Sequence, residues 1–232
     1  MKSKFIVIEG LDGCGKSTQI KLLSERLEAQ GLKYKFIHFP LLDKGVYGKM
    51  IAEFLRGEYG ALNQVHPKLV ALLYANDRKE NAHIIRQWLE EGYYVIADRY
   101  VFSNIVFQCA KLEDEVSKRN LKEWILHFEF VENELPVPAR SFFLDMPFEF
   151  IRKSLTQTRS GGDRDYLCGK QDIHEASLQF QENVYAEYKR LVAERNDFIA
   201  IDCAAADGVP KSPEDINRCI FELMEQEFQA ER

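Results

Sequence analysis

An eight-residue segment near the start of the chain constrains its fold more than any other feature. Residues 10–17 read GLDGCGKS and fit the pattern G-x-x-x-x-G-K-S. They follow an apolar run at 5–9 and precede a segment whose apolar residues repeat with helical spacing. A strand, a glycine-rich loop and a helix in this order bring several backbone N–H groups together around phosphate oxygens. We therefore predict a phosphate-binding loop at the edge of an α/β sheet.

The residues of this loop have distinct expected roles. The glycines let the backbone wrap around the phosphates, and the positive end of the helix dipole adds to the attraction. Lys16 supplies a point charge between the β- and γ-phosphates, and Ser17 places its hydroxyl on Mg²⁺. The alternative, a glycine-rich turn with no ligand, is disfavoured because motif and context both match. The expected nucleotide-binding residues are Gly10, Gly13, Cys14, Gly15, Lys16, Ser17 and Thr18.

The rest of the chain alternates short, β-rich apolar runs with longer segments of helical period. This alternation is typical of βαβ units and of a parallel sheet whose strands are buried on both faces. We predict one domain over residues 1–232, a three-layer α/β fold in which helices flank a central parallel sheet of about five strands. The expected strands are 5–9, 35–39, 93–98, 141–145 and 198–202, and the expected helices are 17–29, 67–90, 147–156, 172–194 and 213–228.

Composition limits the classes of function. Of the 232 residues, 46% are hydrophobic and 29% are charged, and the formal net charge is −6 at pH 7. This acidic balance argues against broad electrostatic binding to nucleic acid or to an anionic membrane surface. The apolar runs fall short of the roughly 18 residues needed to span a bilayer, so we expect a cytoplasmic protein. The five cysteines contain no C-x-x-C pair and the five histidines are not spaced as a ligand set, so we expect neither a zinc site nor a catalytic histidine.

A second apolar run ends in an acid and a base. Residues 93–100 read YYVIADRY, which places Asp98 and Arg99 at the carboxyl end of a strand. In doubly wound folds that edge of the sheet binds the ligand. We expect Asp98 to hold Mg²⁺ directly or through water, and Arg99 to reach a phosphate with its planar guanidinium. The alternative is that Asp98 and Arg99 form only a structural charge pair at the end of the strand. The phosphate-binding loop elsewhere in the chain makes a ligand-binding role the favoured interpretation.

Four stretches of sequence resemble the thymidylate kinase family of P-loop nucleoside monophosphate kinases. They read FIVIEGLDGCGKSTQ, FP, LLYANDRKE and DRYVFSNIVFQ. The similarity is densest over residues 5–111 and can be followed to the C-terminal helix. It implies an enzyme that transfers the γ-phosphoryl group of ATP to dTMP with Mg²⁺ as cofactor. It also implies a homodimer formed through the apolar faces of the early helices.

The resemblance implies roles for single residues as well. Asp12 lies toward the acceptor monophosphate and its sugar, and Arg99 grips the acceptor phosphate. Tyr74 stacks on the base and Arg78 contacts thymine; the two lie four residues apart on one predicted helix, which places them on one face. Without the resemblance, Tyr74 would be interpreted as a core aromatic. The implied substrate-binding residues are Asp12, Tyr74, Arg78, Arg99, Ser103, Gln108 and Tyr166.

A glycine-rich, charged segment at 158–170 reads TRSGGDRDYLCGK and is expected to form a short lid. None of the variable positions 11–14 of the phosphate-binding loop is basic, so the arginine that stabilises the transferring phosphoryl group must come from elsewhere. The resemblance points to Arg159 or Arg164 in the lid, and favours Arg164 because it neighbours Tyr166. The alternative is that both arginines only solvate an exposed loop. The implied catalytic residues are Asp12, Lys16, Arg99, Arg159 and Arg164.

The chain departs from the family pattern in one place. Many members carry an arginine after the FP dipeptide, whereas here FP is followed by LLDK, so Lys44 or Arg56 is the candidate replacement. If neither acts, another P-loop nucleotide or deoxynucleoside kinase with a different acceptor is the main alternative. A nucleotide-dependent switch protein is a weaker one. Its base-reading [NT]-K-x-D motif has only a near match, GKQD at 169–172, which begins in the lid.

Overall fold

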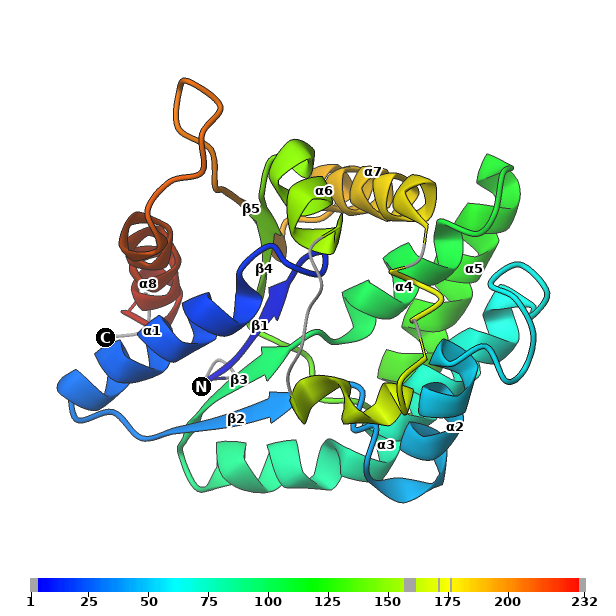
Figure 1. The fold of residues 1–232 in the computed structure, drawn as a ribbon. Coiled ribbons are helices and arrows are strands. Elements are labelled where there is room, and N and C mark those ends of the chain that lie inside the picture. The colour runs from blue at the N-terminus through cyan, green and yellow to red at the C-terminus, as the bar shows by residue number, and fades with distance from the viewer. Residues whose placement is uncertain (1–3, 157–161, 171, 176, 230–232) are drawn as a thin grey trace.

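Five short apolar strands form one parallel sheet in the computed structural model, which describes residues 4–156, 162–170, 172–175 and 177–229 (Figure 1). Their order in space is β2-β3-β1-β4-β5, so β1 occupies the centre, and all five residues of β1 are buried. The predicted strands are confirmed to within one residue at each end. The strands are β1 (Phe5–Glu9), β2 (Tyr34–His38), β3 (Tyr94–Asp98), β4 (Arg140–Asp145) and β5 (Phe198–Asp202).

Helices cover both faces of the sheet, which confirms the predicted three-layer arrangement. On one face α1 (Lys16–Ala29) packs beside α8 (Pro213–Gln229). On the other lie α3 (Pro67–Glu90), α4 (Val101–Cys109) and α7 (Leu178–Glu194). The remaining helical segments are α2 (Gly45–Leu55), α5 (Glu115–His127), the π-helical turn η1 (Phe128–Glu132), α6 (Phe148–Thr156) and the 3₁₀ helix η2 (Gly162–Leu167).

The helix α4 was not predicted from sequence spacing, and its burial explains why. Every one of its nine residues is buried, between α3, α5 and α7. A helix surrounded in this way has no polar face, so its sequence VFSNIVFQC lacks the amphipathic period on which the prediction depends. The helices α2 and α5 were also missed.

One predicted helix boundary is wrong. The expected helix at 172–194 begins only at Leu178, where the hydroxyl of Ser177 accepts a hydrogen bond from the Phe180 amide (3.2 Å). Such an N-cap satisfies a backbone donor that the first helical turn leaves unpaired. The preceding residues 172–175 form a turn instead, and they lie at the carboxyl side of the sheet, near the phosphate-binding loop.

Aromatic packing ties the central strands to the segments around them. Phe5 of β1 meets the ring of Tyr100 edge to face, with ring centroids 5.1 Å apart. On β4, Phe143 stacks on Tyr188 of α7 at 4.7 Å. Burying one large apolar side chain stabilises a fold by about 1.5–3 kcal/mol. These contacts therefore hold Tyr100, at the start of α4, and the helix α7 against the sheet.

The described part of the predicted lid packs against the end of α2. The guanidinium of Arg56 donates to the carbonyl of Tyr166 in η2 (2.7 Å). Just after the lid, in the turn 172–175, the Ile173 amide donates to the carbonyl of Leu55 (3.0 Å). Residues 157–161, which include Arg159, lie outside the described residues. Within the described residues, no helix is both long enough and apolar enough to cross a membrane.

Candidate active site

The loop between β1 and α1 has the backbone that a phosphate cradle needs. Gly10 and Gly15 have φ angles of 150° and 96°, which disfavour any residue with a side chain. A Cβ atom on Gly10 would also lie only 2.6 Å from the sulfur of Cys14. The Lys16 ammonium folds back over the loop and donates to the carbonyls of Gly10 (3.1 Å) and Leu11 (2.9 Å).

The end of β3 places Arg99 beside this loop. Its guanidinium donates to Asp12 Oδ1 (2.9 Å) and to the hydroxyl of Ser103 (3.2 Å), and it lies 5.0 Å from the ring centroid of Phe107. Arg99 has a φ of 64°, in the left-handed region where a side chain is strained. The strain is tolerated because neighbouring contacts hold the turn on several sides. Two predicted site residues, Asp12 and Arg99, are thus brought into direct contact.

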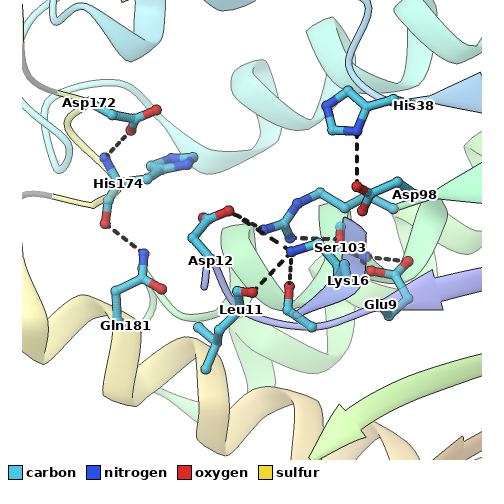
Figure 2. Close-up of polar contacts among 12 residues, drawn as sticks. Glu9, Leu11, Asp12, Lys16, His38, Asp98, Ser103, Asp172, His174 and Gln181 are labelled. Atoms are coloured by element: carbon cyan, nitrogen blue, oxygen red, sulfur yellow. Dashed lines mark hydrogen bonds and ion pairs between the residues drawn. The ribbon is translucent and has the colours of Figure 1, made fainter. Parts of the chain in front are cut away.

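A buried carboxylate at the end of β1 organises this turn (Figure 2). Glu9 Oε1 accepts hydrogen bonds from the backbone amides of Tyr100 (2.9 Å) and Ser103 (3.2 Å). Its other oxygen accepts from the hydroxyls of Ser103 and Tyr188. Burial raises the pKa of Glu9 above its ordinary value. Glu9 therefore ties β1, the start of α4 and α7 to one point beneath Arg99.

The residues present suit a magnesium ion. Asp98 Oδ1 is buried and has no hydrogen-bond partner among the described residues, while Oδ2 lies 3.3 Å from His38 Nδ1. Burial alone would raise the pKa of Asp98, but the charge of Lys16 and the hydrogen bond from His38 outweigh it and lower the pKa. The hydroxyl-bearing Ser17 lines the same cavity as Asp98. An ionised carboxylate and a hydroxyl are oxygen donors of the kind Mg²⁺ prefers, and that ion needs few protein ligands when phosphates supply the rest.

A cavity of about 370 Å³ opens beside these residues, and we call it the central cavity. It is lined by the phosphate-binding loop, the end of β2, α3, α4, the described part of the lid and the turn 172–175. All seven predicted substrate-binding residues line it: Asp12, Tyr74, Arg78, Arg99, Ser103, Gln108 and Tyr166. Segments far apart in sequence thus meet around one space.

One wall of the central cavity contains a buried ion pair. Arg78 is 2% exposed, and it donates to both oxygens of the fully buried Glu129, from Nε (2.6 Å) and from Nη2 (2.7 Å). The amide nitrogen of Asn104 also donates to Glu129 Oε1 (2.8 Å) and to the carbonyl of Ala71 (3.1 Å). Both amide hydrogens of Asn104 are thereby used, and its Oδ1 is buried without a partner among the described residues. The wall therefore presents hydrogen-bond donors from the Arg78 guanidinium and one hydrogen-bond acceptor, Asn104 Oδ1, that has no partner among the described residues.

Other predicted residues are held more indirectly. Tyr74 is half-buried, and burial raises the pKa of its hydroxyl, which keeps it protonated. Gln108 accepts a hydrogen bond from the ammonium of Lys111 (2.8 Å), whose charge lies 4.8 Å from the ring centroid of Phe54. The Tyr166 hydroxyl donates to Asp172 Oδ2 (2.7 Å), and burial raises the pKa of Asp172 to about 6.

The expected replacements for the missing arginine are placed away from the central cavity. Lys44 is exposed at the start of α2, and Arg56 is engaged by Glu58 (2.8 Å) and by the Tyr166 carbonyl, so neither lines the cavity. Of the two lid arginines, Arg159 lies outside the described residues, and only the backbone of Arg164 is described, in η2.

Sequence reasoning missed three residues of the site. Asn104 lies inside the stretch DRYVFSNIVFQ but on the unpredicted helix α4, and it was given no role; Glu129 lies in η1, outside the four stretches that resemble the family. His174 was one of five histidines given no ligand role from their spacing, but it is 6% exposed and its Nε2 has no partner among the described residues. Only the acidic cluster around it, DIHE at 172–175, gave a signal.

Comparison with known proteins points to one family. The family model for thymidylate kinase matches residues 8–207. A thymidylate kinase of Plasmodium falciparum is 32% identical over 194 residues, which cover 83% of this chain and 79% of that protein. One of Mycobacterium tuberculosis is 34% identical over 192 residues, covering 82% and 86%. The solved structure of thymidylate kinase from Candida albicans matches with a TM-score of 0.72 and 26% identity, covering 97% of this chain and 92% of that chain.

Proposed function

Because the chain belongs to the thymidylate kinase family, we propose that it transfers the γ-phosphoryl group of MgATP to dTMP, with dTDP and ADP as products. The observation that carries this assignment is the hydrogen-bonding pattern in the wall of the central cavity. Arg78 offers donors, and beside it Asn104 Oδ1 is an acceptor without a partner in the described part of the chain. The proposed phosphoryl acceptor is the nucleotide whose base complements these hydrogen-bonding groups.

Thymine presents an acceptor, O4, next to a donor, N3–H. Arg78 uses Nε and one Nη2 hydrogen on Glu129, which leaves guanidinium hydrogens for O4, while Asn104 Oδ1 suits N3–H. Cytosine has the reverse pattern, with a donor at N4 and an acceptor at N3, so it would leave buried groups on both sides unsatisfied. Sites that hydrogen-bond a substrate in this way discriminate strongly against the mismatched one.

The 5-methyl group gives weaker discrimination. Tyr74, Phe39 and Phe107 line the central cavity and supply the apolar surface against which a pyrimidine ring and its methyl group pack. One methyl group in an apolar pocket is worth about 1–3 kcal/mol. We therefore propose that dUMP is a poorer acceptor than dTMP, while dCMP is far poorer than both.

The chemistry proposed is in-line attack by an oxygen of the acceptor phosphate on the γ-phosphorus. That oxygen is already ionised near neutral pH, so no general base is needed. Arg99 binds the acceptor phosphate, with Asp12 orienting its guanidinium (2.9 Å). Lys16 exchanges its loop carbonyls for the β- and γ-phosphate oxygens. Positioning and charge neutralisation of this kind supply most of the catalysis in phosphoryl transfer.

Two further groups complete the proposed site. Ser17 and Asp98 would hold Mg²⁺, which would neutralise the negative charge that develops during phosphoryl transfer. The lid at 158–170 supplies an arginine, Arg159 or Arg164, and excludes water that would otherwise hydrolyse ATP. Support for the lid comes from Tyr166, which reaches the central cavity from its described part.

The chain is further proposed to act as a single-domain homodimer in the cytoplasm. Support for the homodimer comes from apolar side chains on the adjoining helices α2 and α3, where Val46 is 65% exposed and Leu69 is 58% exposed. The switch-protein alternative loses its support, because Asp172 of the near-match motif lies in a turn lining the central cavity and does not end a strand.

An ADP-release assay with MgATP tests the proposal. The acceptors are dTMP, dUMP, dCMP, UMP, CMP, AMP and GMP, and a reaction without acceptor is the control. We expect dTMP to give the highest kcat/KM and dCMP to give almost no turnover. A different preferred acceptor would retain a kinase and reject dTMP as its substrate. ATP hydrolysis that does not depend on any acceptor would reject the kinase itself.

A further inference from the structure

We propose that Lys111 is a site of chemical modification, a nucleophilic amine that acyl thioesters convert to an amide, and that this acylation weakens ligand binding in the central cavity. Lys111 follows α4, and neither the sequence pattern nor the proposed phosphoryl transfer gives it a role. The reactivity of the amine is independent of the proposed function. The effect on binding rests on the proposed function, because dTMP is the ligand that measures it.

The surroundings of the Lys111 ammonium are apolar or neutral. The residue is half-buried, and its nitrogen lies 4.8 Å from the ring centroid of Phe54. It donates to Gln108 Oε1 (2.8 Å), an amide oxygen without charge. Burial and the positive charge of Lys111 hold the pKa of His174 well below its ordinary value, so that nearby ring is neutral too. Within the described residues, Lys111 therefore has no carboxylate to offset its loss of hydration.

Two other lysines close by in sequence are placed differently. Lys118 on α5 lies 2.7 Å from Glu187, and Lys122 forms an ion pair with Glu194. A nearby carboxylate favours the charged form of a lysine, which is not nucleophilic. In contrast, burial lowers the pKa of Lys111 to about 7, so about half of this amine is uncharged near neutral pH. Its partial exposure leaves the nitrogen accessible to a small reagent.

An uncharged lysine amine reacts with carbonyl electrophiles. Its nitrogen lone pair forms a bond to the carbonyl carbon of an acyl thioester, the carbon–sulfur bond breaks, and the thiolate leaves with the bonding electrons. The proton that the nitrogen loses passes through solvent to the thiolate. The products are an amide and a thiol, and nothing is oxidised or reduced. Because the amide has no charge, acylation also removes the cost of burying an ammonium group.

Gln108 links this amine to the central cavity. It is 1% exposed and lines the cavity, and its side-chain oxygen accepts the hydrogen bond from Lys111. Acetylation of Lys111 adds an acetyl group beside Phe54 and Gln108. Crowding of a packed site displaces the side chains around it. We therefore expect the acylated protein to bind dTMP less tightly.

The first measurement is the rate of acylation at each lysine. The reagent is S-acetyl-N-acetylcysteamine, a small acyl thioester that has no nucleotide part to bind at the phosphate-binding loop. Peptide mass spectrometry follows the acetylated fraction over time near neutral pH. The comparison sites are the ion-paired Lys118 and Lys21, which is 77% exposed. We expect Lys111 to react about 10-fold faster than either of them. A rate at Lys111 that does not exceed the rate at Lys21 would overturn the assignment.

The second measurement is dTMP binding before and after the same treatment. Calorimetry should show that Kd for dTMP rises about 10-fold once Lys111 of the unaltered protein is acetylated. Lys111→Arg keeps a positive charge and hydrogen-bond donors but has no reactive amine, so the treatment should leave its Kd unchanged. Lys111→Gln, whose amide is neutral and is not acylated, replaces it if melting curves show that Lys111→Arg does not fold.

Two results would overturn the link between Lys111 and the central cavity. An equal rise in Kd for Lys111→Arg would assign the loss to another lysine. An unchanged Kd in protein that is fully acetylated at Lys111 would show that the modification does not reach the cavity. The proposed function fails in a different assay, if the untreated protein does not phosphorylate dTMP.

Discussion

The two sides of the central cavity are built in different ways. The side proposed to bind ATP, which we call the donor side, is one continuous loop and helix start at residues 10–18, and its lysine bonds to the carbonyls of its own loop. The side proposed to bind dTMP, which we call the acceptor side, draws Arg78 from α3, Asn104 from α4 and His174 from a turn before α7. Glu129 of η1 holds Arg78 from behind. A phosphate can be bound by local backbone geometry alone, whereas a particular base must be matched by side chains from several directions.

The difference extends to energetics. Ser17 and Thr18 on the donor side are exposed, so changes there affect binding and turnover more than folding. On the acceptor side the Arg78–Glu129 pair is buried at 2% and 0% exposure. In the proposed function, Arg78 would therefore both stabilise the fold and bind the base. Removing one partner of a buried pair leaves an uncompensated charge. The predictions below separate these two kinds of dependence.

The largest effect is expected on the donor side. Lys16→Ala should lower kcat by roughly 10²–10³-fold, because a preorganised charge at the transferring group is lost. The melting temperature should stay close to that of the unaltered protein. The matched control is Lys21→Ala, whose lysine is 77% exposed on α1 and should leave kcat unchanged. Steady-state ADP release measures both. Substantial turnover in Lys16→Ala would contradict the role given to the loop.

On the acceptor side we expect a large effect on the stability of the fold. Glu129→Gln is expected to lower the free energy of unfolding by about 3 kcal/mol, because Arg78 stays buried beside a neutral partner. Urea unfolding measures this loss. Glu132→Gln, at a side chain 61% exposed, is the control and should change stability by less than about 0.5 kcal/mol. Equal stabilities of the two variants would mean that the ion pair does not support the fold.

Base selectivity gives a smaller, more specific effect. Asn104→Ala should reduce the preference for dTMP over dCMP by about 10-fold, because the acceptor for N3–H is removed. The preference is measured as a ratio of two kcat/KM values, so a general loss of folded protein cancels. Asn183→Ala, at an exposed position of α7, is the control. An unchanged ratio would remove Asn104 from base recognition while leaving the family assignment intact.

The smallest effect concerns the pH dependence of stability. Burial lowers the pKa of Lys111 to about 7 in the folded protein, below its usual value of about 10.4 in an unfolded chain. Between these values the unfolded state holds more protons, so the stability that Lys111 contributes rises as pH rises from 7 toward 10, by at most about 1.4 kcal/mol per pH unit. Unfolding of the unaltered protein and of Lys111→Met should therefore diverge in that range. Parallel curves would show that Lys111 is not buried in solution.

The same contrast explains what the sequence could predict. The five strands and the phosphate-binding loop follow from short contiguous patterns, so they were located to within one residue. The Arg78–Glu129 pair joins positions 51 apart in sequence, and no spacing rule connects them. Asn104 was hidden in a helix without a polar face, and the misplaced start of α7 hid the turn that carries His174. Each of these residues takes its place in the site from tertiary packing, which a local sequence pattern does not encode.

Glu9 has a consequence for how such a protein can change. Its carboxylate, on the last residue of β1, accepts hydrogen bonds from the first turn of α4 and from Tyr188 of α7. In the proposed function, a substitution of Glu9 would disturb the binding of both substrates together, so a change of acceptor nucleotide, natural or engineered, has to leave Glu9 in place. Ser103 belongs to the same hydrogen-bond network. Three residues that line the central cavity each have a buried polar atom without an internal partner in the described structure: Asp98, Asn104 and His174. Asp98 is the proposed Mg²⁺ ligand, so Asn104 and His174 are the positions more open to such change.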